Sequence, residues 1–167
     1  TAVVLMAACA QSTTTSNTNA TTNSATTTAT KTNQSSYFTE KDNDTSYDES
    51  TASKIELSGS SANVSGDGVT VSESTVTITK SGTYVISGQS DGVQIKVEAD
   101  ESADVQLVLK GVTMTNTNAA ISATSAGHVY LTLAEGTTNS LSDSSSNSDE
   151  KADAALFSKA DLTINGK

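Results

Sequence analysis

Short runs in which apolar and polar residues alternate constrain this chain more than any other feature. Six of them occupy residues 76–78, 84–86, 93–97, 105–109, 129–133 and 162–164. Alternation at period two is the pattern of a half-buried β-strand. Turn-forming residues bound the runs, in stretches such as SDG, KGV, EGTTN and NGK. Since no stretch carries a helical stripe, we predict an all-β protein.

The runs also recur as a repeated phrase of two strands, a polar corner and a turn. Val105, Val129 and Leu162 open the second strand of successive phrases, at intervals of 24 and 33 residues. One such phrase makes one coil of a parallel β-helix, whose inward residues are buried only when coils stack. We therefore predict a β-solenoid. A β-sandwich is the alternative, since evenly spaced short strands suit it too, and it predicts tight hairpin turns.

The first 53 residues differ in composition from the rest of the chain and contain none of the ten glycines. Residues 1–9 end in Met-Ala-Ala-Cys, a pattern that resembles a bacterial lipoprotein signal. We expect Cys9 to be lipidated and to hold the protein on the outer face of the membrane, at the bacterial cell surface. The alternative is a stray apolar end with a buried cysteine.

Residues 10–53 are rich in Ser, Thr and Asn and poor in apolar residues, so we predict a disordered tether. Residues 54–167 form the expected folded domain. A solenoid end needs a cap, and the last run is followed only by Asn165, Gly166 and Lys167. We therefore expect a fragment of a longer protein.

The charge of the chain excludes one class of partner. The net charge is −10, and all nine basic residues are lysines. Nucleic-acid binding depends on basic side chains that neutralise phosphates, so we exclude it. An acidic surface rich in Ser, Thr and Asn is typical of a soluble exported protein, which we expect to be a monomer.

Three phrases carry a resemblance to a known family: DVQLVLKGVTMTN, AEGTTNSLSD and DAALFSKADLTING. They resemble the carbohydrate-binding domain family of bacterial surface proteins, from about residue 54 onward and most closely from residue 105. The resemblance implies a right-handed parallel β-helix similar to that of pectate lyases. It also implies binding of plant cell-wall polysaccharides, such as cellulose and acidic pectin-like glycans, with bound calcium and without established catalysis.

The alternation predicts a polar outer face. If Val105, Leu107 and Leu109 point inward, their neighbours Gln106 and Val108 point outward. Stacked coils would then present amides, hydroxyls and an aromatic ring to a long sugar polymer. The candidate ligand-binding residues are Tyr130 for stacking, Gln106 and Thr132 for hydrogen bonds, and Lys96 and Lys110 for uronate carboxylates. Alternatively, the tyrosine is only a good strand former and the lysines are solvated.

Carboxylates gather between residues 143 and 161. The candidate calcium ligands are Asp143, Asp149, Asp153 and Asp161, because calcium takes six to eight oxygen ligands. Calcium would also let an acidic domain approach an acidic glycan. The alternative is a solvated acidic loop. Residues 42–50 mimic the start of an EF-hand, but Tyr47 stands where that loop needs glycine, so we interpret them as solvated acids.

Our leading interpretation is calcium-assisted, non-catalytic polysaccharide binding. Lyases of the similar fold use Arg or Lys as the base, but this chain has no arginine and no lysine in a recognisable motif. We assign no catalytic residue. A pectate-type polysaccharide lyase is the first alternative, and a structural adhesin stalk is the second.

Overall fold

The computed structural model describes residues 38–144, 152 and 154–166. Every described residue belongs to one compact unit, Gln34–Lys167. The regular elements are strands except for one 3₁₀ turn, η1 (Lys41–Asn43). The all-β prediction is therefore confirmed for the described residues. Among these residues, the structure contains no helix with the length and apolar character needed to span a bilayer.

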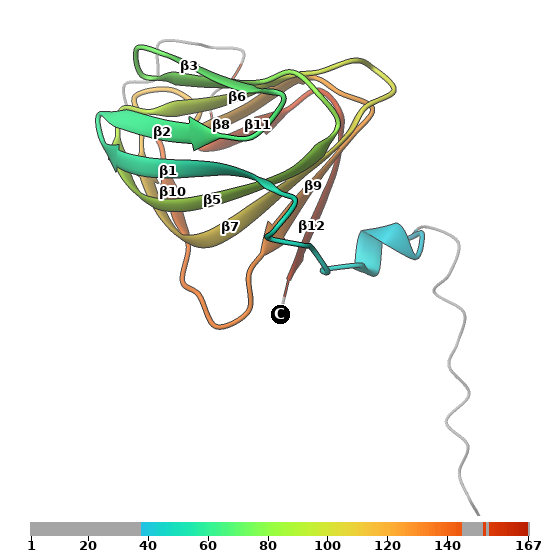
Figure 1. Cartoon of the computed structure of the whole chain (residues 1–167). Coiled ribbons are helices and arrows are strands. Elements are labelled where there is room, and N and C mark those ends of the chain that lie inside the picture. The colour runs from blue at the N-terminus through green and yellow to red at the C-terminus, as the bar shows by residue number, and fades with distance from the viewer. Residues whose placement is uncertain (1–37, 145–151, 153, 167) are drawn as a thin grey trace, which may run out of the picture. The chain divides into compact units, whose positions relative to one another are not determined.

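The strands form two sheets (Figure 1). The larger sheet contains β1 (Ser53–Gly59), β2 (Ser61–Ser65), β5 (Gly82–Asp91), β7 (Asp104–Thr115), β9 (His128–Leu133), β10 (Ser140–Ser142) and β12 (Asp161–Gly166). Its order is β12-β9-β7-β5-β1-β2, with β10 also paired to β7. The smaller sheet contains β3 (Val69–Ser72), β4 (Thr75–Ile78), β6 (Gln94–Glu98), β8 (Ile121–Ser125) and β11 (Leu156–Ser158). Its order is β11-β8-β6-β4-β3.

Both sheets are mixed. Strands β1, β5, β7, β9 and β12 pair in parallel in the larger sheet, as do β4, β6, β8 and β11 in the smaller one. The pairs β1–β2 and β3–β4 are antiparallel, so the hairpins of the sandwich alternative occur at one edge of each sheet. The register places Val105 beside Val129 and Val129 beside Leu162, which confirms the alignment of the repeated phrases.

The core lies where the two sheets face each other. Val105, Leu107 and Leu109 are buried in one cluster that also contains Ile95 and Ile121 of the smaller sheet. This confirms that these three residues of β7 point inward. Each fully buried aliphatic side chain contributes about 1.5–3 kcal/mol. The core is built from aliphatic residues because the chain has no tryptophan and few aromatic residues.

One glycine marks a close approach between strands. The register of β5 and β7 shifts between Ile86 and Gly88. Gly88 has a φ of 91°, and a Cβ built there would lie 2.4 Å from the carbonyl oxygen of Leu57 on β1. The position therefore requires a residue without a side chain.

Residues 38–52, which we call the strap, lie against the outer face of the larger sheet. The sequence predicted a disordered tether as far as residue 53, whereas the structure gives these residues defined contacts. Tyr47 and Ala52 pack on Val85, Val108 and Ala134. The folded unit thus begins earlier than expected. The sequence did not indicate this, because the residues that the strap contacts lie far away along the chain. Cys9 and residues 10–37 lie outside the described residues.

Candidate functional site

Hydrogen bonds from side chains of the sheet hold the first half of the strap. The Thr163 hydroxyl on β12 donates to the Asp42 carboxylate at 2.5 Å, and His128 Nε2 lies 2.8 Å from the same hydroxyl. The Asn165 amide donates to the carbonyls of Asp42 and Asp44, both at 3.1 Å. The hydrogen bond from Thr163, with others from Thr39, lowers the pKa of Asp42 to about 2, so this side chain is ionised at neutral pH.

Ion pairs add to these contacts at both ends of the strap. Lys110 lies 2.8 Å from the Glu49 carboxylate, and this pairing raises the pKa of Lys110 and lowers that of Glu49. Near the other end, Lys41 pairs with Asp104 and lies 4.9 Å from the centre of the Tyr130 ring. All four charged groups are about half exposed, so water screens both pairs and each contributes little to stability on its own.

The strap covers most of the predicted ligand-binding residues. Gln106 and Tyr130 are neighbours in the register of β7 and β9, and Thr132 follows on the same face, as the alternation predicted. The strap leaves Tyr130 only 8% exposed and Thr132 only 1% exposed, however, so the expected open strip of side chains is closed here. The reason is that a segment distant in sequence lies on this face.

The contacts of these residues show how they are covered. Tyr130 stacks on His128, with ring centres 4.1 Å apart. The Gln106 amide donates to the Thr132 hydroxyl and to the Ser46 carbonyl of the strap, each at 3.2 Å. Lys110, the fourth candidate, is paired with Glu49 of the strap.

Lys96, the fifth candidate, lies elsewhere. It belongs to β6 in the smaller sheet, where its ammonium group is 3.4 Å from the Glu98 carboxylate. The structure thus brings four of the five candidates together on one face and separates the fifth from them.

The predicted calcium ligands are only partly within the described residues. Asp143 and Asp161 are described and exposed, whereas Asp149 and Asp153 are not described. Within the described part of the chain, no group of three or more His, Cys, Asp or Glu residues is arranged to hold a metal ion. Calcium binding therefore stays a prediction.

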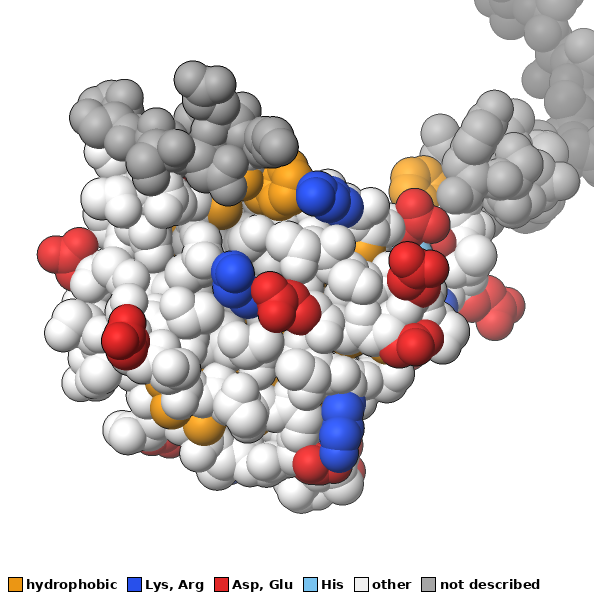
Figure 2. All heavy atoms as spheres, turned by 90° about the horizontal axis from the view of Figure 1, so that it is seen from above, with side chains coloured by type: hydrophobic (Ala, Val, Ile, Leu, Met, Phe, Trp, Pro, Cys, Tyr) orange, Lys and Arg blue, Asp and Glu red, His pale blue; other side chains and the backbone are white. Residues whose placement is uncertain are grey.

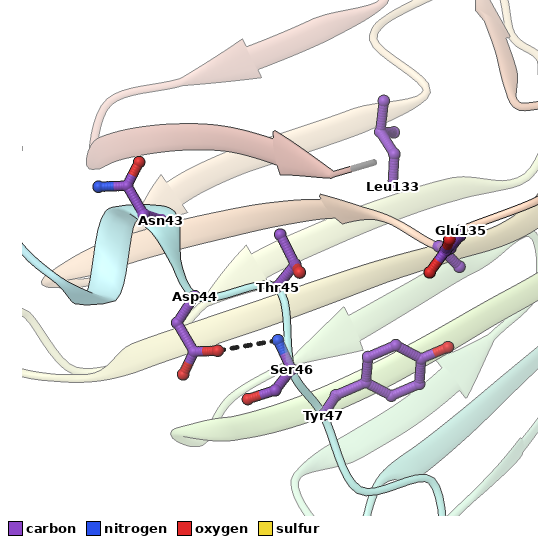
Figure 3. Close-up of a pocket in the computed structure, with 8 residues that line it drawn as sticks. Asn43, Asp44, Thr45, Ser46, Tyr47, Leu133 and Glu135 are labelled. Carbon is purple, nitrogen blue, oxygen red and sulfur yellow. Dashed lines mark hydrogen bonds between the residues drawn. The ribbon is translucent and has the colours of Figure 1, made fainter. Parts of the chain in front are cut away.

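A cavity of about 590 Å³ opens between the strap and the end of β9 (Figure 3). Its lining residues are Asn43, Asp44, Thr45, Ser46 and Tyr47 of the strap, with Leu133, Ala134 and Glu135 at the end of β9. In Figure 3 the Tyr47 side chain extends from the strap towards the side on which Glu135 lies. Hydrogen bonds from Ser46 lower the pKa of Asp44, which keeps that carboxylate ionised.

The cavity combines groups that suit a sugar. An aromatic ring and aliphatic side chains can contact the apolar face of a sugar ring, while carboxylates, an amide and hydroxyls can bind its hydroxyl groups. None of the eight lining residues is basic. Sequence reasoning missed this site because its strap residues lie in a polar stretch without periodicity; the single aromatic residue, Tyr47, was the only signal there.

Comparisons with known proteins agree with this chemistry. Residues 72–167 match the family model described as carbohydrate-binding domain-containing protein. A protein of that description from Acetivibrio thermocellus is 38% identical over an alignment of 93 residues, and the match covers 52% of this chain and 32% of the relative.

A solved structure is similar as well. It is described as a polysaccharide lyase-like protein from C. thermocellum, in a gadolinium derivative, with 37% identity and a TM-score of 0.63. The match covers 70% of this chain and 50% of that one, so the chain spans half or less of the length of both relatives. Because the family model covers more than half of the 167 residues, this chain belongs to the family of carbohydrate-binding domain-containing proteins.

Proposed function

We propose that the protein binds a plant cell-wall polysaccharide, without cleaving it, in the cavity between the strap and the end of β9. The observation that carries the proposal is the lining of this cavity, where the Tyr47 ring lies with the Asn43 amide and the carboxylates of Asp44 and Glu135. Membership of a carbohydrate-binding family supports it. An aromatic platform with a few polar groups is the usual composition of a specific small-molecule site.

Of the two expected glycan classes, the cavity favours a neutral one such as cellulose. Two carboxylates and no basic residue line it, so a uronate would meet like charge. On the face drawn in Figure 2, charged side chains are scattered among uncharged ones, several as neighbours of opposite sign, and lysines form no broad patch. Neutral hydroxyl groups can instead donate hydrogen bonds to the carboxylates.

An acidic glycan would need a cation that bridges it to the protein. We therefore propose calcium assistance for binding of that ligand. Calcium is a hard cation that prefers oxygen ligands, and so is gadolinium, of which the solved relative forms a derivative. The acidic stretch between residues 143 and 161 remains the proposed location.

The fold that we infer behind this site is a right-handed parallel β-helix. The parallel pairing of β5, β7, β9 and β12, and of β4, β6, β8 and β11, supports it. Successive strands from β4 to β9 alternate between the two sheets, as the two strands of each coil would. The handedness rests on the resemblance to pectate lyases.

We also propose that the domain is held at the bacterial cell surface by a lipid on Cys9. The apolar residues before this cysteine and the polar stretch after it support an anchor and a tether. Expressed with a complete export signal, the protein should fractionate with membranes, and Cys9→Ser should release it. Membrane association that is unchanged in Cys9→Ser would exclude the lipid anchor.

Retention on insoluble glycans tests the binding function. The protein is mixed with cellulose and with pectate, each with and without a chelator, and the bound fraction is measured. We expect retention on cellulose that does not depend on the chelator, and retention on pectate that is weak unless calcium is present. The absence of retention on any glycan would overturn the proposal in favour of an adhesin stalk.

Two substitutions locate the site. Glu135→Ala removes an exposed carboxylate from the cavity, and loss of a hydrogen bond to a charged group should weaken cellulose binding about tenfold. Tyr47→Ala should weaken it by a similar factor, whereas Tyr47→Phe should bind almost normally because it keeps the ring. Unchanged binding in both Glu135→Ala and Tyr47→Ala would place the site elsewhere.

A polysaccharide lyase is the second candidate, favoured by the description of the solved relative. The same pectate mixtures distinguish it, because lyase action releases an unsaturated uronate that absorbs in the ultraviolet. Retention without this product supports a binding protein, and its appearance would make the protein an enzyme.

A further inference from the structure

The cavity depends on a segment that the sheet does not hold through its backbone. Among the described residues, every backbone-to-backbone hydrogen bond of the strap joins two strap residues, as in Asp44 to Lys41 and Ala52 to Asp48. Five of the eight residues that line the cavity belong to this segment. The position of the cavity wall is therefore set by side chains of the sheet that reach the strap.

Asn165 is the most central of these side chains. It lies on β12 next to Thr132 of β9, on the outer face of the sheet. Its amide donates to the carbonyls of Asp42 and Asp44, which flank Asn43, the first residue of the cavity wall. Fixing two carbonyls two residues apart fixes the path of the backbone where the wall begins. Asn165 itself does not line the cavity.

The far end of the wall is held separately. The Gln106 amide donates to the Ser46 carbonyl at 3.2 Å, and the Tyr47 ring packs in the cluster that contains Val108. Two residues farther along, Glu49 pairs with Lys110. Contacts on both sides thus hold the wall from Asn43 to Tyr47, and neither Gln106 nor Lys110 lines the cavity.

We propose that Asn165 is a positioning residue of the glycan site, which exists only while the strap is docked on β7, β9 and β12. Glycan binding and strap docking then favour each other. This inference rests on the proposed function, because it assigns the cavity wall to the glycan site. Linkage between two equilibria is reciprocal, so a ligand that binds only the docked form must also hold the strap down.

The test uses the full chain and two readouts. Asn165→Ala removes both hydrogen bonds and should weaken retention on cellulose roughly tenfold. It should also speed cleavage at Lys41, in the strap, by a lysine-specific protease. In the wild-type protein, soluble cellohexaose should slow this cleavage, an effect that a purely structural role of Asn165 does not predict.

Controls keep the test specific. Asn63→Ala makes the same substitution at an exposed position of β2 and should change neither readout. If Asn165→Ala fails to fold, Glu49→Gln loosens the other end of the strap at an exposed position and should shift both readouts in the same direction.

The possible failures are distinguishable. Cellulose retention by the wild type with no change in Asn165→Ala, or with a cleavage rate that cellohexaose leaves unchanged, would overturn the positioning role and leave the proposed function intact. Failure of the wild type to bind any glycan would remove both.

Discussion

Tyr130 shows how the role of a single residue depends on what covers it. The residue lies on the outer face, as the alternation along β9 predicted, and an exposed tyrosine there would be a good platform for a sugar. In the structure, His128 stacks against the ring and Lys41 of the strap lies near it. Its aromatic surface thus contributes to strap docking, and in the proposed site Tyr47 serves as the sugar platform instead.

Gly88 allows a sharp test at the same scale. Gly88→Ala should destabilise the fold by about 1–3 kcal/mol more than Gly92→Ala, because overpacking adds to the strain of a positive φ. The two glycines have nearly equal φ values of 91° and 94°, but only at Gly88 would a Cβ meet another atom, the Leu57 carbonyl oxygen. Urea unfolding of the two variants measures the difference. Equal losses of stability in the two variants would show that β1 moves away from the new side chain without a cost in free energy.

At the scale of elements, the strap joins the sheet through carboxylates, and this makes its docking sensitive to acid. The pKa of Asp42 is lowered from 3.8 to about 2 in the docked strap, mainly by the hydrogen bond from Thr163. The pKa of Glu49 is lowered by Lys110. A group whose pKa is lowered by docking stabilises the docked form above its free pKa and loses this effect as the pH falls through the docked value.

We therefore expect the strap to stay docked above pH 3.8 and to be released as the pH falls towards 2. Cleavage of the strap by pepsin, measured against an unstructured reference peptide, follows this release, and far-UV circular dichroism monitors the sheets. Thr163→Val removes the hydroxyl donor and should move the release to higher pH. Equal protection at both ends of this pH range would contradict the expectation.

The two sheets also show where strands pair in parallel and where they pair as antiparallel hairpins. The parallel strands follow the repeated phrases of the sequence, whereas β1–β2 and β3–β4 form antiparallel hairpins outside the repeat. Within the described ranges, only Glu73, in the turn between β3 and β4, has a positive φ without being glycine. Such a turn lets two strands that are adjacent in sequence pair with each other. A strand of a stacked coil pairs instead with a strand of the next repeated phrase.

At the scale of the whole molecule, the net charge of −10 should affect the binding of an acidic glycan and of a neutral glycan differently. Long-range repulsion should oppose an acidic polysaccharide and leave a neutral one unaffected. Because the Debye length is about 10 Å at 0.1 M salt, added salt screens this repulsion.

Retention on cellulose should therefore change little with salt, and weak retention on pectate should rise with salt and more strongly with calcium. Binding isotherms on both glycans at low and high sodium chloride measure this. Retention on pectate that falls with salt would indicate attraction to basic residues instead, and would point back to the lysines of the larger sheet.

The sequence by itself determined the strands that its alternating runs mark, β4, β5, β6, β7, β9 and β12, because alternation and turn residues act over a few neighbours. It also determined the register of successive strands, in which Val105, Val129 and Leu162 align as the repeat predicted. For the candidate site, the sequence supplied the outer face of the larger sheet, on which the strap lies, but none of the predicted binding residues lines the cavity.

Only the tertiary structure decided that the strap covers this face and that the cavity lies beside the strap. Glu49 meets Lys110 across 61 positions, and Asp42 meets Thr163 across 121. A short polar segment has no period that indicates a partner, and each of its contacts is weak alone. Its position is therefore determined by the several side chains that the folded sheet brings to one face, which no local pattern contains.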